Sequence, residues 1–145
     1  MISGIGIDLV HVASVAESIQ HYGDQYLERV FTRDEIAYCG AVPSSMQRYA
    51  GRIAAKEAAM KALATGLDSG VDWLDFEVTN EPSGEPRLRA HGLAAEILRK
   101  KGVYTMRVSL SHLPEYAIAQ VIFERSRRQA LLYWLRRLYR NRTAE

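Results

Sequence analysis

Apolar and polar residues alternate near the start of the chain. Over residues 4–10, Ile5, Ile7 and Leu9 alternate with Gly4, Gly6, Asp8 and Val10, a period of two that is typical of a β-strand. Asp8 falls on the face opposite these three aliphatic residues, although strands rarely keep an aspartate. The pattern predicts a strand with one apolar face and a carboxylate on the other.

The next apolar residues follow helical spacing. Residues 12–22 carry apolar positions three and four apart and are followed by Gly23, which predicts a helix that ends there. Asp24 is expected to cap a short helix. Thr32 and Glu35 have the spacing of a capping box, so a third helix is predicted to begin between them.

A longer helix and further strands are predicted downstream. The helix begins near Ser44 or Ser45 and ends near Ala64, and its alanine-rich turns would let neighbouring backbone come close. We expect strands over residues 74–79, 87–89, 103–110 and 116–123, a helix over residues 92–101 and a loop over residues 111–115. Helices and strands do not alternate regularly, so their order favours the α+β class.

The composition excludes several classes of protein. With 145 residues, 48% of them hydrophobic and 25% charged, the chain is expected to form one globular domain rather than a disordered or fibrous structure. No apolar run is long enough to cross a membrane, and the first residues lack the pattern of an export signal. The only cysteine, Cys39, excludes an internal disulfide and a multi-cysteine zinc site, and it favours a packing role in a reducing cytoplasm.

Positive charge is concentrated at the end of the chain. Residues 124–145 hold seven arginines and two glutamates, whereas the whole chain has a net charge of only +2, so the body is net acidic. This distribution argues against nucleic acid as a partner of the body. We expect a catalytic or binding domain over residues 1–124 and a basic amphipathic helix over residues 125–145. That helix would pack on the body or a neighbouring subunit, or contact an acidic carrier or an anionic membrane surface.

Two carboxylates are candidates for a metal site. Asp8 and Glu57 are hard oxygen ligands of the kind that Mg²⁺ uses when it leaves positions for water and substrate phosphates; alternatively, each is a surface or capped carboxylate. On the predicted long helix, Arg52 and Lys56, and Glu57 and Lys61, are spaced four residues apart. This spacing fits a solvated face, and it also fits a site where Lys61 neutralises a phosphate.

The sequence Ser111-His112 follows the end of a predicted strand. Such a pair can be an ordinary hydrogen-bonded loop, or it can offer hydroxyl and imidazole donors to a phosphate. The glycines at Gly4 and Gly6 do not form a dinucleotide-binding fingerprint, because Leu9 occupies the third glycine position and the strand continues through it.

Taken together, these segments resemble the holo-acyl-carrier-protein synthases, a family of 4′-phosphopantetheinyl transferases. The matching motifs occur in the family's order at residues 4–10, 28–35, 50–58, 61–66 and 109–112. The resemblance implies a single-domain α+β fold in which a mostly antiparallel sheet packs on a long central helix. It also implies Mg²⁺-dependent transfer of the 4′-phosphopantetheine group from coenzyme A to a serine of an apo acyl carrier protein, with release of adenosine 3′,5′-bisphosphate.

The resemblance also implies roles for individual residues. Asp8 and Glu57 match the metal ligands, and Lys61 matches the lysine that faces the reacting phosphates, so Glu57 and Lys61 are the candidate catalytic residues. The positions expected around the nucleotide phosphates of coenzyme A, to which Lys61 also belongs, are matched by Arg52, Ser111 and His112. The group that accepts the serine proton stays open between Glu57, a metal-bound water and a carrier carboxylate.

One difference from the longer members of the family makes the chain resemble the short class. Val10 stands where longer, two-lobed relatives carry an acidic residue, and the short class forms homotrimers with sites between subunits. The first helix lacks the arginines with which that class commonly meets its acidic carrier, so the resemblance does not identify the carrier. A non-catalytic module that binds coenzyme A or a carrier is the alternative; the intact Asp8, Glu57 and Lys61 favour the enzyme.

Overall fold

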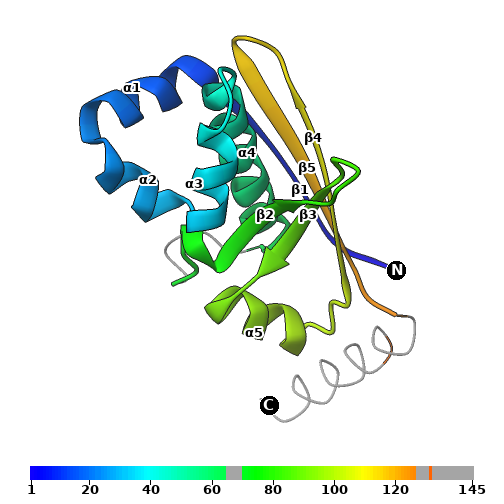
Figure 1. Cartoon of the computed structure of the whole chain (residues 1–145). Helices are drawn as coiled ribbons and strands as arrows, with labels where there is room; N and C mark the ends of the chain where they lie inside the picture. Colours follow the sequence, from blue (N-terminus) through cyan, green and yellow to red (C-terminus); the bar gives the residue numbers. More distant parts are fainter. Residues whose placement is uncertain (65–69, 127–130, 132–145) are drawn as a thin grey trace.

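The computed structural model describes residues 1–64, 70–126 and 131 and shows the predicted α+β class (Figure 1). Two antiparallel sheets are present in the described part, a three-stranded sheet in the order β1-β5-β4 and a hairpin of β2 and β3. The strands are β1 (Ile2–His11), β2 (Phe76–Asn80), β3 (Pro86–Ala90), β4 (Thr105–His112) and β5 (Tyr116–Glu124). The helices are α1 (Val12–Tyr22), α2 (Asp24–Val30), α3 (Arg33–Gly40), α4 (Ser45–Leu63) and α5 (Gly92–Lys100).

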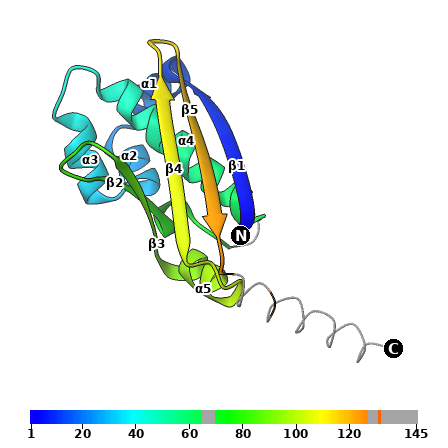
Figure 2. The same cartoon turned by 90° about the vertical axis from the view of Figure 1, so that its right-hand side faces the viewer.

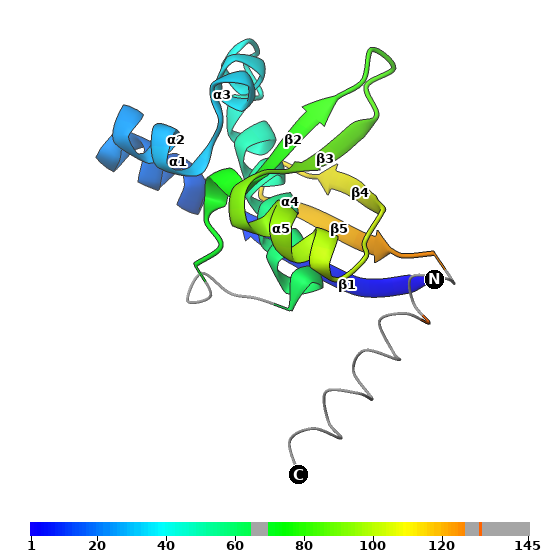
Figure 3. The ribbon, with the colours of Figure 1, turned by 90° about the horizontal axis from the view of Figure 1, so that it is seen from below.

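Helix α4 is the central element, as the alanine-rich sequence predicts. The sheet lies on one side of α4, and α1, α2 and α3 lie on the other (Figure 1), while the view from below shows the β2–β3 hairpin and α5 close to it (Figure 3). Ala54, Ala55, Ala58 and Ala59 are completely buried. Small side chains on the helix therefore allow neighbouring elements to pack closely around it, in two core clusters that both include residues of α4.

Strand β1 lies very close to α4. A Cβ atom at Gly6 would overlap the carbonyl oxygen of Ala58, and one at Gly4 would overlap that of Ala62. Both positions must therefore be glycine if the strand is to keep this distance from the helix. The same face of the strand carries Asp8 toward α4.

The large aliphatic residues of β1 are on its other face. Ile5, Ile7 and Leu9 are 56%, 55% and 61% exposed, and Tyr116 and Ile118 of β5 are exposed as well. The predicted alternation is confirmed, but the apolar face points away from the helix because only glycine fits on the inner side. Figure 2 looks onto this outer face, where β5 lies between β4 and β1.

Several predicted boundaries are confirmed and a few differ. The helix over residues 12–22 and the capping box of Thr32 and Glu35 are present as predicted. Gly23, rather than Asp24, holds the N-cap position of α2, and the predicted strand over residues 74–79 begins only at Phe76, because Trp73–Asp75 forms a 3₁₀ turn. Strand β4 continues to His112 and so includes residues that were predicted to form a loop.

The end of the described fold is tied to its beginning. The N–H of Arg125 donates to the carbonyl of Met1 at 2.9 Å, and the Met1 amino group donates to the carbonyl of Arg125 at 2.7 Å. Most of the predicted helix over residues 125–145 lies outside the described residues. Within the described part of the chain, no helix combines the length and apolar character needed to cross a membrane.

Candidate active site

Three predicted site residues meet between β1 and α4. The Lys61 ammonium donates hydrogen bonds to Asp8 Oδ1 at 2.6 Å and to the carbonyl of Ile7 at 3.2 Å. Glu57 lies one helical turn before Lys61, and its carboxyl interacts with that of Asp8. Asp8, Glu57 and Lys61 are called the carboxylate cluster below. Residues separated by some fifty positions in the chain thus form one site.

The two carboxyl groups of this cluster lie close enough to affect each other's charge. Burial raises the pKa of Glu57, and the negative charge of Asp8 raises it further, while Lys61 acts in the opposite direction. The hydrogen bond to Asp8 raises the pKa of the Lys61 ammonium, which therefore stays charged. One lysine compensates only part of the charge of two carboxylates, so the cluster attracts a cation.

The donor set fits Mg²⁺. Magnesium is commonly held by one or two protein carboxylates and completes its octahedron with water and substrate phosphates. No group of three or more histidine, cysteine or acidic residues that could hold a metal is found among the described residues.

Tyr26 is a neighbour of the cluster that the sequence did not reveal. Burial raises the pKa of its phenol, a hydrogen bond from Ser18 lowers it, and the charge of Glu57 raises it. Tyr26 belongs to α2 and Ser18 to α1, so both helices contribute a polar side chain to the surroundings of Glu57. Tyr26 lies on a short helix and belongs to no sequence motif, so only the structure identifies it as a neighbour of the cluster.

The residue before Glu57 forms a different ion pair. Lys56 Nζ lies 2.8 Å from Glu35 Oε2, and both side chains have no exposed surface. The ammonium also donates to the carbonyls of Val30 at 2.7 Å and Trp73 at 3.1 Å. Burial lowers the pKa of Lys56, and the charge of Glu35 opposes that shift. The interpretation of the Arg52 and Lys56 positions as a solvated face is wrong, because both residues are buried.

The remaining predicted residues line a separate cavity. Arg52, Ser111 and His112 border a cavity of about 260 Å³ at the start of α4, together with Gln47, Gly51, Gly84, Pro86 and Leu110 and three further polar residues, Tyr38, Arg48 and Asn80. None of the residues that line it is acidic. We call it the arginine cavity. The structure thus brings these three predicted residues together, but it does not bring them to the carboxylate cluster within one chain.

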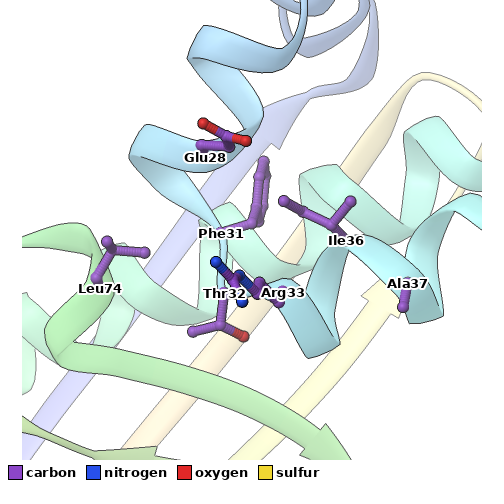
Figure 4. A pocket seen from close by; sticks show the side chains of 7 residues that line it. All are labelled: Glu28, Phe31, Thr32, Arg33, Ile36, Ala37 and Leu74. Carbon is purple, nitrogen blue, oxygen red and sulfur yellow. The ribbon is translucent and has the colours of Figure 1, made fainter.

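A larger cavity lies elsewhere in the described part of the protein. It has a volume of about 680 Å³ and opens between α2, α3 and the 3₁₀ turn, where Figure 4 shows its lining residues. It is bordered mainly by apolar side chains such as Phe31, Ile36 and Leu74, and Glu28 and Arg33 also line it. None of the predicted site residues lines this cavity.

Comparison with known proteins identifies the family. The model of the 4′-phosphopantetheinyl transferase superfamily matches residues 4–121, and the chain belongs to this superfamily. Within it, the chain is similar to holo-[acyl-carrier-protein] synthases. It is 48% identical to the one from Koribacter versatilis over 124 residues, which cover 86% of this chain and 99% of that protein. It is 45% identical to the one from Solibacter usitatus over 124 residues, with the same coverage.

Solved structures agree with this relationship. The synthase of Neisseria meningitidis superposes with a TM-score of 0.78 at 27% identity, covering 86% of this chain and all of that one. The Helicobacter pylori synthase in complex with coenzyme A has a TM-score of 0.72 at 29% identity and covers 83% and 99% of the two chains. The Bacillus anthracis synthase in complex with CoA (3′,5′-ADP) has a TM-score of 0.72 at 34% identity and covers 87% and 99%. The family resemblance and the fold predicted from the sequence are confirmed.

Proposed function

We propose that the protein transfers the 4′-phosphopantetheine group of coenzyme A to a serine hydroxyl of an apo acyl carrier protein. The serine oxygen forms a bond to the β-phosphorus, the bond from that phosphorus to the leaving adenosine 3′,5′-bisphosphate breaks, and the serine proton passes to a base. Membership of the superfamily supports this reaction, and so do relatives named as synthases. The observation that carries the proposal is the assembly of Asp8, Glu57 and Lys61 at one place.

The carboxylate cluster supplies positioning and charge. Lys61 is 55% exposed at its side chain and keeps its charge, so its ammonium can contact an incoming phosphate while Asp8 holds it in place. Mg²⁺ is the proposed cofactor; held by Asp8 and Glu57, it would neutralise charge on the pyrophosphate of coenzyme A. Preorganised charges of this kind are a main source of catalysis in phosphoryl transfer, because little covalent chemistry is required of the protein.

The arginine cavity is the proposed binding site for nucleotide phosphate. Arg52 is 4% exposed, so its guanidinium is desolvated, and Ser111 and His112 add a hydroxyl and an imidazole. A hydrogen bond to an anion is strengthened when the donor is charged and partly removed from water. The absence of an acidic lining residue makes the cavity suitable for an anion.

We also propose that the protein is a homotrimer with active sites between subunits. The outer face of the three-stranded sheet presents Ile5, Ile7, Leu9, Tyr116 and Ile118, a contiguous set of exposed apolar side chains that a subunit interface would cover. In a closed assembly, the arginine cavity of one subunit and the carboxylate cluster of another could together form one active site.

The assembly is tested by placing a charge on this face. Ile7→Glu is expected to give monomers in light scattering and to abolish transfer, because the acidic group would be buried in the interface. Leu93→Glu on α5 is the matched control, since Leu93 is also exposed and lies away from the sheet face. A fully active monomer of the unchanged protein would refute the trimer.

The reaction itself is tested by mass spectrometry of purified apo carriers after incubation with coenzyme A and Mg²⁺. The expected result is a carrier serine that gains one phosphopantetheine group, and fatty-acid, polyketide and peptide-synthetase carriers can be compared side by side. Stable binding of coenzyme A or carrier without any mass increase would instead support a non-catalytic binding module.

The cytoplasm is the proposed location. The only cysteine, Cys39, is completely buried and free, and burial raises the pKa of its thiol to about 11. A chain without disulfides fits a reducing compartment.

A further inference from the structure

The start of β1 and the end of β5 lie at one end of the molecule, together with the last turn of α5. Figures 1 and 2 show all three at the end opposite the turn between β4 and β5. Hydrogen bonds join Met1 to Arg125, and the N–H of Tyr104 donates to the carbonyl of Glu124 at 2.9 Å. We call this end the terminal surface; its side chains are those of Met1, Ile2, Arg99, Lys100, Lys101, Tyr104 and Arg107.

The terminal surface presents apolar side chains to solvent. Met1, Ile2 and Tyr104 are 58%, 52% and 61% exposed. They lie outside the set of side chains that forms the proposed subunit interface, so that interface does not account for their exposure. A further surface is needed to cover them.

Positive charge on the terminal surface is only partly compensated. Two of its cations belong to exposed ion pairs with Glu96 and Glu124. Arg99, Lys101 and the Met1 amino group have no carboxylate partner among the described residues. This end is therefore basic, although the body as a whole is net acidic.

The chain continues from the terminal surface into a basic amphipathic sequence. The match to the family model ends at residue 121, and 124 residues of this chain cover 99% of each of two relatives, so residues 126–145 are an addition to the shared domain. Apolar residues recur in this segment at helical spacing, and arginines fall on the opposite side of the predicted helix. The apolar positions are Leu131, Trp134, Leu135 and Leu138, and the opposite positions are Arg136, Arg137 and Arg140.

Leu131 is the member of this apolar stripe that the structure describes. It is helical and 56% exposed, so more than half of it faces solvent. The other positions of the stripe lie outside the described residues, and their pattern is a property of the sequence. The stripe therefore begins uncovered, next to a surface that is itself apolar and basic.

An anionic lipid bilayer matches both properties. A helix with arginine on one face and tryptophan and leucine on the other is typical of segments that lie in the membrane interface, where acyl chains and headgroups are both within reach. Cytoplasmic leaflets carry a negative surface potential that attracts basic segments close to them. An acidic protein partner would match the arginines but would leave the apolar stripe to be covered by something else.

We propose that the terminal surface and residues 126–145 together bind the surface of an anionic phospholipid bilayer. The apolar stripe enters the boundary between headgroups and acyl chains, and the arginines contact the headgroup phosphates. Arg99 and Lys101 on the body face the same headgroups. In the proposed homotrimer, rotation about a single axis keeps the three terminal surfaces on one side, so one bilayer can contact all of them.

The test is co-sedimentation of the full chain with vesicles, which needs neither coenzyme A nor a carrier. Vesicles of equal parts phosphatidylcholine and phosphatidylglycerol are compared with vesicles of phosphatidylcholine alone. The protein should bind the anionic vesicles more tightly by about tenfold or more, and added salt should weaken this binding. Deletion of residues 126–145 should lower the affinity by about tenfold or more and leave kcat for transfer unchanged.

Two point variants of equal charge separate the apolar stripe from net charge. Leu135→Glu places a carboxylate on the stripe and should lower vesicle affinity about tenfold, whereas Gln129→Glu adds the same charge on the opposite side and should change it less than about threefold. On the body, Arg99→Gln should weaken binding, and Arg33→Gln, which removes an exposed arginine from α3, is the control.

Several outcomes would overturn the proposal. These are equal affinity for the two kinds of vesicle, binding that survives the deletion, and a rise in the carrier KM or a fall in Tm after deletion of a segment that binds no vesicles. The last two results would assign residues 126–145 to the carrier or to packing. A protein that binds anionic vesicles but transfers nothing would refute the proposed function and leave this inference standing. If the truncated chain does not fold, Leu135→Glu and Gln129→Glu make the same test in the full chain.

Discussion

Helix α4 carries two lysine–carboxylate pairs that look alike in distance and differ in surroundings. Lys56 lies 2.8 Å from Glu35, and neither side chain is exposed; Lys61 lies 2.6 Å from Asp8, and its side chain is 55% exposed. Five residues of helix turn the second lysine about 140° away from the first, so one faces α3 and the other faces β1. The comparison shows that access to solvent, rather than the ion pair itself, separates a structural lysine from one that can act on a substrate.

The hydrogen bonds of the two lysines support this distinction. An ammonium has three donors, and Lys56 uses them on Glu35, Val30 and Trp73. Lys61 has two acceptors among the described residues, Asp8 and the carbonyl of Ile7, which leaves a donor for a phosphate. Lys56 therefore joins α4 to the segments around it, whereas Lys61 is available for chemistry.

The largest expected effect is on activity at the exposed pair. Glu57→Gln and Asp8→Ala should each lower the rate of transfer by a factor on the order of 10²–10³ or more, because each removes charge from the proposed metal site. The rate is measured with an apo carrier at saturating coenzyme A and Mg²⁺. Glu96→Gln, an acidic residue exposed on α5, is the control. Near-normal turnover of either variant would remove these residues from the metal site.

Glu57→Gln should not destabilise the fold. The pKa of Glu57 is raised in the folded protein by burial and by Asp8, so the folded state binds this proton more tightly than the unfolded state. The contribution of Glu57 to the free energy of unfolding therefore falls as the pH rises above 4.5, the ordinary pKa of a glutamate carboxyl. At neutral pH and without metal, Glu57→Gln should have a Tm at least equal to that of the unchanged protein, and Mg²⁺ should raise the Tm of the unchanged protein only.

The second effect is on stability at the buried pair. Lys56→Met leaves the Glu35 carboxylate without its cation and should lower the free energy of unfolding by about 3–5 kcal/mol, measured by urea denaturation. Adding Glu35→Leu should recover much of this loss, since a well-packed apolar pair often replaces a buried ion pair without penalty. If the single variant is as stable as the unchanged protein, the pair does not hold α3 against α4.

The sequence predicted the exposed pair better than the buried pair. The capping box showed correctly that Glu35 begins a helix, and its Oε2 does accept from the N–H of Thr32 at 2.9 Å. The contact of Glu35 with Lys56 depends on how α3 packs against α4, which no local pattern encodes. Family resemblance grouped Asp8, Glu57 and Lys61, and the structure places them together.

The apolar face of β1 is a second feature that the local sequence pattern predicted only in part. Alternation identified the strand, but helix contact through Gly4 and Gly6 decided which face points outward. The arginine cavity likewise unites Ser111 and His112 at the end of β4 with residues of α3 and α4, and Arg48 and Tyr38 had no motif to mark them. The resemblance supplied the positions that match the family's motifs, whereas features of tertiary packing required the structure.

A smaller effect is expected for the exposed lysine. Lys61→Ala should lower transfer by about tenfold to a hundredfold, because it removes the charge that is proposed to contact the phosphates. The free energy of unfolding should fall by less than in Lys56→Met, because the Lys61 side chain is 55% exposed, although its partner Asp8 is only 10% exposed. Measuring both quantities on Lys56→Met and Lys61→Ala sharpens the comparison: equal losses of stability in the two variants would contradict it.

The smallest effect on chemistry is expected from deletion of residues 126–145. Both lysine pairs and every predicted site residue precede this segment, and Arg125, whose backbone pairs with Met1, is kept. The deletion removes six arginines and most of the local positive charge.

If the segment binds the carrier, its loss should raise the KM for the carrier and weaken the salt dependence of that KM, with little change in the KM for coenzyme A. If it packs on the body or on a neighbouring subunit, the Tm should fall and the salt dependence should stay. A truncated protein that is folded and assembled, yet has lost kcat at saturating levels of both substrates, would place residues 126–145 in the active site and contradict the boundary proposed at residue 124.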